Sequence, residues 1–496
     1  MKNFLKTKPL FLFLLPVFFI LHGFSEYFGF VTLKDALLLA LIYIVSALLI
    51  AGLFWLFYRN FTKAALIAFL VMGYYFFFGS MHDLLKNYFP DTFITRYSFI
   101  LPASFLFLLA VIIILKKANK PFPKFIAYLN LLLLLLLVSD LVLLTGKITR
   151  KNESAAIEDV NEIFSRCHSC KRPDIYLIIL DEYAGNTELK ELCNFDNSAF
   201  ENELRYRGFY VTAESTSNYN ITHYSIASTL NMDYLELDMK ATEQENYKYC
   251  AGLMSNNAAL NFLALYGYRF YNKPFFEIPG QPDRQHVNFL PSKTKLITSQ
   301  TFLSRLFKDI VLNKASGKVH FRPLLKKYIY EVLHKNEDIL RLTREIAATQ
   351  TSMPKFVYIH LMMPHFPYYF DSAGNVKSLE RLVEAQPSDI PGYTGYLQYC
   401  NKKILQLVDD LKDSSPEPPV IMLLGDHGFR HFKKKVESRY YFMNLNAVYI
   451  PDKNYRLFYA NMSNVNLFRV LFKTQFHQDF PILKDSTIFK QFSLEH

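Results

Sequence analysis

Cysteine is scarce in this sequence, and none of its five cysteines precedes residue 167. Two of them, Cys167 and Cys170, lie close together in the run CHSC. No second pair follows at the spacing of a zinc finger, and no thioredoxin-like segment surrounds the first pair. We therefore expect a structural disulfide between Cys167 and Cys170. The odd count leaves at least one cysteine without a disulfide partner.

An excess of positive charge is missing from most of the chain. The net charge is +11, but residues 1–151 hold 15 Lys and Arg against 5 Asp and Glu and account for +10 of it. The remaining 345 residues carry only +1 and lack the broad basic face that nucleic acids require. We expect no nucleic-acid partner and attribute the positive charge to membrane topology.

Long apolar runs, by contrast, are abundant before residue 147. Hydrophobic residues make up 51% of the chain, which is high for a soluble protein. Most of the runs approach or reach the roughly 18 to 20 residues that a membrane-spanning helix needs. They are Pro9–Phe24, Ala36–Phe57, Ala64–Gly79, Tyr97–Leu115 and Phe125–Leu144. Residues 1–146 are therefore predicted to form a transmembrane region of five helices.

The lysines before the first run also occur in signal peptides, but four more runs follow and no small-residue cleavage site is evident. We expect a retained membrane anchor. Loops rich in Lys and Arg tend to face the cytoplasm. We therefore expect a cytoplasmic location for the N-terminus, for the loop with Arg59 and Lys63, and for the loop at residues 116–124. Five crossings then place everything after Leu144 outside.

The outer part begins with a polar linker over residues 147–172, with a short amphipathic helix expected at Ile157–Phe164. From Pro173 onward, apolar strand candidates alternate with helical stretches. This alternation predicts a mostly parallel sheet sandwiched by helices on both faces. The strand candidates are residues 174–180, 208–211, 268–271, 355–361 and 420–424.

Three of these strands carry acidic or imidazole side chains at or just beyond their carboxyl ends. Ligands of such sheets bind beyond the carboxyl ends of the strands, so we expect these groups to converge on one edge. Oxygen and nitrogen donors brought together in this way suit a divalent metal ion. The candidates are Asp181, Glu182, His360, His365, Asp426 and His427.

Each of these residues has a plainer explanation when taken alone. An aspartate after a strand often caps the next helix, and a lone histidine is usually structural. The run GDHG makes that explanation less attractive for Asp426 and His427, because packing does not require such a pair directly after an apolar strand. Gly425 and Gly428 would let the backbone approach a ligand closely.

The segment from Glu214 to Met232 offers a nucleophile. It is polar up to Asn220 and then becomes helical, with Thr222 at or near the start of the helix. The amide groups and positive dipole end of a helix N-terminus favour a phosphate or sulfate, and a metal-bound hydroxyl is a good nucleophile. The alternative is that Thr222 only caps the helix.

In the order of its motifs, the sequence resembles the alkaline phosphatase and sulfatase superfamily. The motifs are a strand followed by Asp, a Thr with a Ser three residues later, a pair of histidines, and GDHG. Five N-terminal spans before an exported catalytic domain are similar to the phosphoethanolamine transferases and lipoteichoic acid synthases. The resemblance implies an alkaline phosphatase-like catalytic domain over residues 173–496.

The resemblance also implies a role for each candidate residue. Asp181, Thr222, Asp426 and His427 would be the metal ligands, with Glu182 as the alternative to Asp181. Thr222 would be the nucleophile, and Ser225 takes the place of the family's serine. His360 and His365 would contact the transferred group or protonate the leaving oxygen.

Two departures from the sulfatase pattern bear on the substrate. Ile226 stands where sulfatases carry an arginine, and the nucleophile position holds neither Cys nor Ser. Both disfavour a formylglycine sulfatase and favour phosphorus chemistry. No second full set of metal ligands is evident, so we expect one tightly held ion, Zn²⁺ or Mn²⁺, and leave a second ion open.

The resulting hypothesis is a phospho-group transferase or hydrolase of the bacterial cytoplasmic membrane, with its catalytic domain on the periplasmic side. It would act on a lipid or envelope-polymer phosphoester through a covalent threonine intermediate. The alternatives are a sulfatase-type hydrolase and an inactive relative that binds an anionic envelope ligand. A transporter is disfavoured because the spans hold few polar residues.

Overall fold

The computed structural model describes residues 2–28, 31–90, 92–118, 122–155, 167, 170–238, 243–273, 294–307, 309 and 322–491. The chain divides into two compact units. The first is Met1–Glu158 with Gln285–Leu325, and the second is Asp159–Arg284 with Lys326–His496. The helix expected at Ile157–Phe164 lies outside the described residues.

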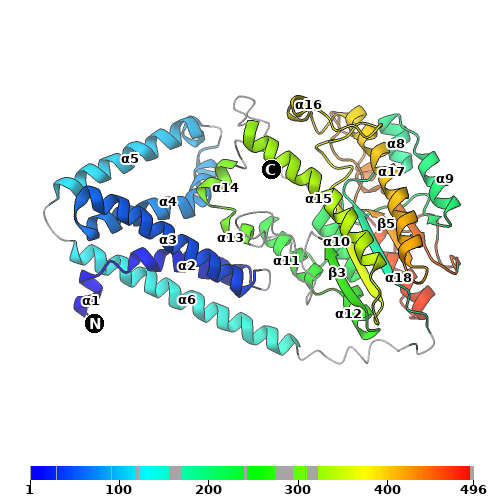
Figure 1. Cartoon of the computed structure of the whole chain (residues 1–496), viewed down its shortest axis with the longest axis horizontal. Helices are drawn as coiled ribbons and strands as arrows, with labels where there is room; N and C mark the ends of the chain where they lie inside the picture. Colours follow the sequence, from blue (N-terminus) through cyan, green and yellow to red (C-terminus); the bar gives the residue numbers. More distant parts are fainter. Residues whose placement is uncertain are drawn as a thin grey trace. The chain divides into compact units, whose positions relative to one another are not determined.

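The first unit is built from long apolar helices (Figure 1). Among the described residues, four helices are long and apolar enough to cross a membrane, and α2 is a shorter apolar helix of 16 residues. Four of the five expected spans are therefore confirmed by length and composition, and the first is shorter than a usual span. The helices are α1 (Lys2–Thr7), α2 (Phe11–Glu26), α3 (Leu33–Tyr58), α4 (Phe61–Tyr88), η1 (Phe93–Thr95), α5 (Tyr97–Lys117) and α6 (Pro123–Ala155).

Polar side chains start two of these helices. The Thr32 side chain accepts a hydrogen bond from the backbone N–H of Asp35 at α3, and Asn60 does the same for Lys63 at α4. Helices α2, α3, α4 and α6 pack side by side. Most of the exposed large apolar side chains of the described residues lie on this unit, as expected for a surface that faces lipid.

A short segment from later in the chain also packs in the first unit. It contains α13 (Lys295–Thr298) and α14 (Phe302–Leu306). The backbone N–H of Gly79 in α4 donates to Gln300 O at 2.8 Å, and Ile297 is buried among the apolar helices. By contacts this segment belongs with the apolar helices, although it follows residue 173 in sequence.

The second unit contains a sheet with the strand order β2-β6-β5-β1-β4-β3. Strands β3, β4, β1 and β5 run parallel, β6 is antiparallel to β5, and β2 is antiparallel to β6. The expected mostly parallel sheet is confirmed, and β6 is a strand that the sequence did not predict. The bounds are β1 Ile175–Leu180, β2 Tyr210–Val211, β3 Arg269–Lys273, β4 Lys355–Leu361, β5 Val420–Gly425 and β6 Asn446–Tyr449.

The central strands are buried on both faces, which explains their unbroken apolar sequences. One face packs against α10 (Thr222–Asn231), α12 (Ala258–Leu265) and α18 (Asn464–Phe476). Helices α8 (Asn186–Cys193), α9 (Ser198–Tyr206) and α17 (Ile390–Ser414) pack together as a second layer (Figure 1). The remaining helices are α11 (Glu243–Ser255), α15 (Arg322–Ala348), α16 (Leu379–Glu384) and η5 (Ser438–Phe442).

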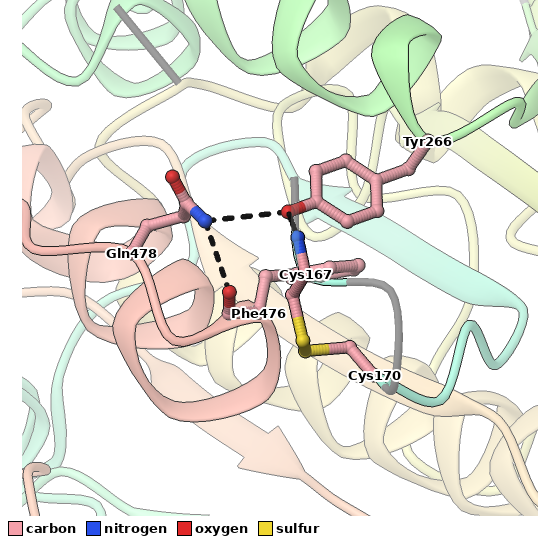
Figure 2. Close-up of a disulfide and its surroundings, with 5 residues drawn as sticks. All are labelled: Cys167, Cys170, Tyr266, Phe476 and Gln478. Carbon is pink, nitrogen blue, oxygen red and sulfur yellow. Dashed lines mark hydrogen bonds between the residues drawn. A yellow bond between two sulfur atoms is a disulfide. The ribbon is translucent and has the colours of Figure 1, made fainter. Parts of the chain in front are cut away.

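A disulfide joins Cys167 to Cys170 just before β1, as expected from the sequence. Figure 2 shows how this segment is held. The backbone N–H of Cys167 donates to the hydroxyl of Tyr266 at 3.1 Å, and Gln478 donates to the same hydroxyl at 3.2 Å and to Phe476 O at 3.0 Å. The chain that enters the sheet is therefore fastened to the ends of α12 and α18.

Candidate active site

The register of the sheet brings two aspartates to one point. Leu180, the last residue of β1, is paired with Gly425 of β5 and with Leu361 of β4. The residue after each strand therefore leaves the sheet at the same edge. The backbone N–H of Glu182 donates to Asp426 Oδ1 at 2.9 Å, which links the two strand ends directly.

Asp181, Asp426 and His427 form a compact group of possible metal ligands. Their ligand atoms lie within 4.8 Å of one another, and all three side chains are buried. Asp426 Oδ1 accepts from the N–H groups of Glu182 and His427, whereas Asp181 Oδ1 and Asp426 Oδ2 have no hydrogen-bond partner among the described residues. Because burying an unpaired carboxylate oxygen is costly, this donor set fits a divalent cation.

The tautomer of His427 follows from its contacts. Its Nδ1 lies 2.8 Å from Gly428 O, and a carbonyl oxygen can only accept, so Nδ1 carries the hydrogen. Nε2 then presents a lone pair, and it lies 3.2 Å from Thr222 Oγ1. The hydroxyl of Thr222 therefore meets the group formed by Asp181, Asp426 and His427.

Thr222 is the first residue of α10, but it is not the cap. Ile221 occupies the cap position, and no side chain caps the helix there. The capping alternative for Thr222 is therefore wrong. Three residues along, Ser225 Oγ donates to Asp426 O at 2.6 Å and ties the first turn of α10 to the strand end. Thr222 as a whole residue is partly exposed.

The charge states of the group suit a metal ligand set. Burial alone would raise the pKa of Asp181, but the charge of His365 and a hydrogen bond from His360 hold that pKa below its usual range. Burial and the charge of Arg430 lower the pKa of His427 to about 3. Burial and the nearby Asp181 raise the pKa of Asp426. A neutral imidazole and a crowded pair of carboxylates are what a cation would neutralise and bind.

The two histidines of the predicted pair lie in different surroundings. His360 in β4 has a side chain that is 0% exposed, with Nε2 3.4 Å from Asp181 Oδ2 and Nδ1 3.2 Å from the Tyr358 hydroxyl. His365 is partly exposed. Burial opposes its protonation, yet Asp181 and Glu182 raise its pKa above the usual value. The structure thus places His360 against a predicted ligand and leaves His365 accessible.

The alternative ligand Glu182 belongs to a neighbouring group. Its ligand atoms lie within 4.8 Å of those of His365 and His431. The sequence analysis did not identify His431 and Arg430, which begin the charged run RHFKKK. Arg430 donates from its backbone N–H to Glu182 Oε1 at 3.1 Å and from Nη1 to Asn220 O at 3.1 Å. Their position directly after GDHG was the signal that could have identified them.

The glycines of GDHG lie where the backbone is closely packed. A Cβ at Gly425 would lie 2.5 Å from Tyr183 O, and one at Gly428 would lie 2.4 Å from Tyr440 O. These are contacts with the protein's own backbone. The glycines therefore allow close packing of the backbone around Asp426 and His427.

A family model described as Sulfatase matches residues 190–478, which is more than half of the chain. The chain belongs to the sulfatase family. It is accordingly an enzyme of phospho- or sulfo-ester chemistry within the alkaline phosphatase superfamily. Thr222, His365, Asp426 and His427 lie inside the matched range, and Asp181 lies just before it.

Several solved structures are similar to this sulfatase-family chain at low sequence identity. The C-terminal periplasmic domain of EcEptC from Escherichia coli is 11% identical, with a TM-score of 0.39, over 62% of this chain and 84% of that chain. The corresponding domain of phosphoethanolamine transferase EptC from Campylobacter jejuni is 14% identical, with a TM-score of 0.34, over 61% and 89%. The putative sulfatase yidJ from Bacteroides fragilis is 14% identical, with a TM-score of 0.36, over 63% and 76%. No curated protein gives a significant match.

Proposed function

We propose that this sulfatase-family protein is a metal-dependent, membrane-bound phosphotransferase or hydrolase that uses Thr222 as a covalent nucleophile. The observation that carries the proposal is the hydroxyl of the partly exposed residue Thr222, which lies 3.2 Å from His427 Nε2 beside two buried aspartates. A cluster of this kind suits the activation of a hydroxyl more than it suits packing.

The ligand set proposed for the cation is Asp181, Asp426, His427 and Thr222. Two carboxylates, one imidazole and a hydroxyl are donors that Zn²⁺ and Mn²⁺ accept. A cation bound there would lower the pKa of the Thr222 hydroxyl and offset the negative charge of the reacting ester. Asp426 is held for this purpose by main-chain N–H groups, and His427 by its hydrogen bond to Gly428 O.

In the first step, Thr222 Oγ1 would form a bond to phosphorus while the bond to the leaving ester oxygen breaks, and that oxygen keeps the electron pair. In the second step, water or an acceptor hydroxyl would form a bond to phosphorus while the bond from phosphorus to Thr222 Oγ1 breaks, which transfers the phospho group and restores the threonine. Thr222 lies at the N-terminus of α10, where free amides and the helix dipole favour an anion.

Two neighbours have supporting roles in the proposal. His360 would orient Asp181, since it lies fully buried 3.4 Å from that carboxylate. His365 is the histidine that is open enough to meet the transferred group. Arg430, tied to Asn220 just before the nucleophile, would add positive charge where the sulfatase arginine is replaced by Ile226.

The substrate is proposed to be a lipid or envelope-polymer phosphoester. The long apolar helices and the lysines that flank them support a bacterial cytoplasmic-membrane location with the catalytic unit on the periplasmic side. Sulfate-ester hydrolysis is the second candidate, because the matching family model is that of the sulfatases. An inactive relative would bind metal and an anionic envelope ligand without turnover.

The direct test is mass spectrometry of the purified full chain during turnover of phospholipid and sulfate-ester substrates. We expect phosphate on Thr222, none in Thr222→Ala, and normal labelling in Thr394→Ala, a partly exposed threonine of another helix. Turnover by Thr222→Ala, or sulfate-ester cleavage with no phosphoester activity, would contradict the proposal. Metal binding without any turnover would support the inactive relative.

A further inference from the structure

We infer that Cys167, Cys170 and His477 bind a zinc ion when the disulfide between the two cysteines is reduced. The possible ligand atoms of these residues lie within 4.8 Å of one another. All three residues belong to the second unit. None of them has a part in the proposed catalysis, so the inference is independent of the proposed function.

The three residues lie away from the catalytic edge of the sheet. Cys170 precedes β1, whereas Asp181 follows its last residue. A strand of six residues spans about 20 Å. The group formed by Cys167, Cys170 and His477 is therefore separate from the cation group proposed at the other end of β1.

The spacing of the two cysteines suits a metal ion as well as a disulfide. Two residues separate them, a spacing that is common in zinc sites. Thiolates and imidazoles together are also frequent ligands of zinc. The sequence favoured a disulfide because no second pair of cysteines follows. His477 lies far along the chain, and only the fold brings it to the cysteines.

The backbone holds His477 beside the disulfide. His477 ends α18 in a left-handed conformation, with a φ of 53°, and its N–H is bonded within the last turn of the helix. Figure 2 shows its two neighbours in sequence, Phe476 and Gln478, close to the disulfide. Gln478 and the backbone N–H of Cys167 both donate to the Tyr266 hydroxyl. These hydrogen bonds join the two segments independently of the S–S bond.

The cysteines of CHSC are more accessible than the others. Both are partly exposed, and His477 is exposed. The other three cysteines of the chain are buried, and burial raises the pKa of Cys193 to about 12. Thiols that are buried and protonated are inert. A reductant and a metal ion can therefore reach the CHSC pair while the remaining cysteines stay shielded.

Opening the disulfide requires a dithiol reductant. One thiolate of the reductant attacks a sulfur of the pair, and its second thiol resolves the mixed disulfide. The S–S bond between Cys167 and Cys170 breaks, two electrons and two protons pass to these residues, and the reductant becomes a disulfide. Zn²⁺ then replaces the two thiol protons, which are released to water.

Reduction would leave the fold largely intact. In the chain-entropy view, a disulfide that closes a short loop adds less stability than one that closes a long loop, and this loop spans a sequence separation of 3. A bound zinc ion would replace the local disulfide with a link between the chain that enters β1 and the end of α18. The competing explanation is a permanent structural disulfide with an unrelated surface histidine nearby.

The test uses Co²⁺ in place of zinc, because thiolate ligands give Co²⁺ an intense near-ultraviolet charge-transfer band that oxygen and nitrogen ligands do not. The detergent-solubilised full chain would be titrated before and after reduction with dithiothreitol, which is then removed under argon. We expect the band only after reduction, and its loss when Zn²⁺ is added. Asp426→Asn should keep the band, because its defect lies at the other end of β1.

His477→Ala should weaken Co²⁺ binding by about 10-fold or more, since losing a ligand matters at least as much as losing a residue that orients one. His334→Ala, which removes an exposed histidine of α15, should bind like the wild type. A reduced wild type without the band would overturn the site and leave the proposed function standing. A band of unchanged affinity in His477→Ala would also overturn it.

Thermal unfolding gives an independent readout that does not depend on the band. A ligand that binds only the folded state raises the melting temperature. Zinc should therefore raise the melting temperature more in the reduced than in the oxidised protein, and this difference should vanish in His477→Ala. Equal rises in the reduced and oxidised wild type would count against the site.

Discussion

Each unit of the molecule holds a buried aspartate that faces a histidine. In the apolar helices, Asp140 of α6 lies 3.1 Å from His22 of α2, with side chains 7% and 55% exposed. In the catalytic unit, Asp181 lies 3.4 Å from His360, with side chains 4% and 0% exposed. In both pairs, one carboxylate oxygen has no hydrogen-bond partner among the described residues.

The two pairs differ in which other possible metal ligands lie close to the aspartate. Asp181 shares its surroundings with Asp426 and His427, which are some 245 positions away in sequence but adjacent across β1 and β5. No group of three possible metal ligands among the described residues includes Asp140. A buried Asp–His pair alone therefore does not mark a catalytic centre. The convergence of parallel strand ends does.

The largest expected effect is that of Asp181→Asn compared with Asp140→Asn. Removing the Asp181 charge should lower turnover about a thousandfold or more and release the bound metal, because a cation site loses one of its two aspartates. Asp140→Asn should change turnover of the folded protein by no more than about threefold, within the scatter of changes that leave the transition state untouched.

Turnover and metal content per folded chain are the two measurements. Equal losses of activity in the two variants would contradict the difference between the two pairs, since both aspartates would then serve the chemistry. Retention of metal by Asp181→Asn would remove Asp181 from the ligand set.

Substituting the histidines of the same two pairs should change turnover and metal affinity less than substituting Asp181. His360→Gln should reduce turnover or metal affinity roughly 10- to 100-fold, which is typical for a residue that orients a ligand. His22→Gln, on the exposed side of its pair, should have little effect. Zinc titration of both variants, combined with kinetics, would check this. An unchanged zinc affinity and turnover in His360→Gln would show that Asp181 needs no support.

The packing around GDHG can be tested through stability. Gly428→Ala should destabilise the protein by about 1–3 kcal/mol, because its Cβ would lie 2.4 Å from Tyr440 O and 2.5 Å from Glu188 Oε2. Gly252→Ala in α11 has nothing within 4 Å and should stabilise by up to about 1 kcal/mol. Thermal unfolding of the full chain would measure both. An unchanged stability of Gly428→Ala would mean that the end of β5 is loosely packed.

The smallest effect is expected from breaking an ion pair on the surface of the catalytic unit. Arg207 donates two hydrogen bonds to Asp409, at 2.8 and 3.0 Å. Arg207→Ala should cost about 1 kcal/mol of unfolding free energy, because the pair is partly exposed and screened. Turnover should be unchanged. A loss of activity similar to that of Asp181→Asn would show that proximity to the strand ends is not what matters.

The sequence predicted the strands and their chemistry because both are local patterns. Five apolar runs in the catalytic unit became β1 to β5, and Asp181, Asp426 and His427 follow strands that end in register. The rule that ligands bind beyond parallel strand ends then brought residues from distant segments together. Their catalytic roles stay predictions.

The features that the sequence did not predict depend on tertiary contacts. β6 is a four-residue strand with the ordinary sequence Asn446–Tyr449, and its pairing with β5 and β2 defines it. His431 joins Glu182 because the chain folds back after GDHG. The packing of α13 and α14 with the apolar helices joins segments more than 200 residues apart, for which no local pattern exists.

The most direct measurement is anomalous X-ray scattering at the zinc absorption edge from crystals of the zinc-loaded protein. The account predicts a peak at coordination distance, roughly 2.0 to 2.2 Å, from oxygens of Asp181 and Asp426 and from His427 Nε2, with Thr222 Oγ1 on the same ion. A zinc peak that shares none of these atoms, or a Thr222 hydroxyl turned away from the ion, would contradict it.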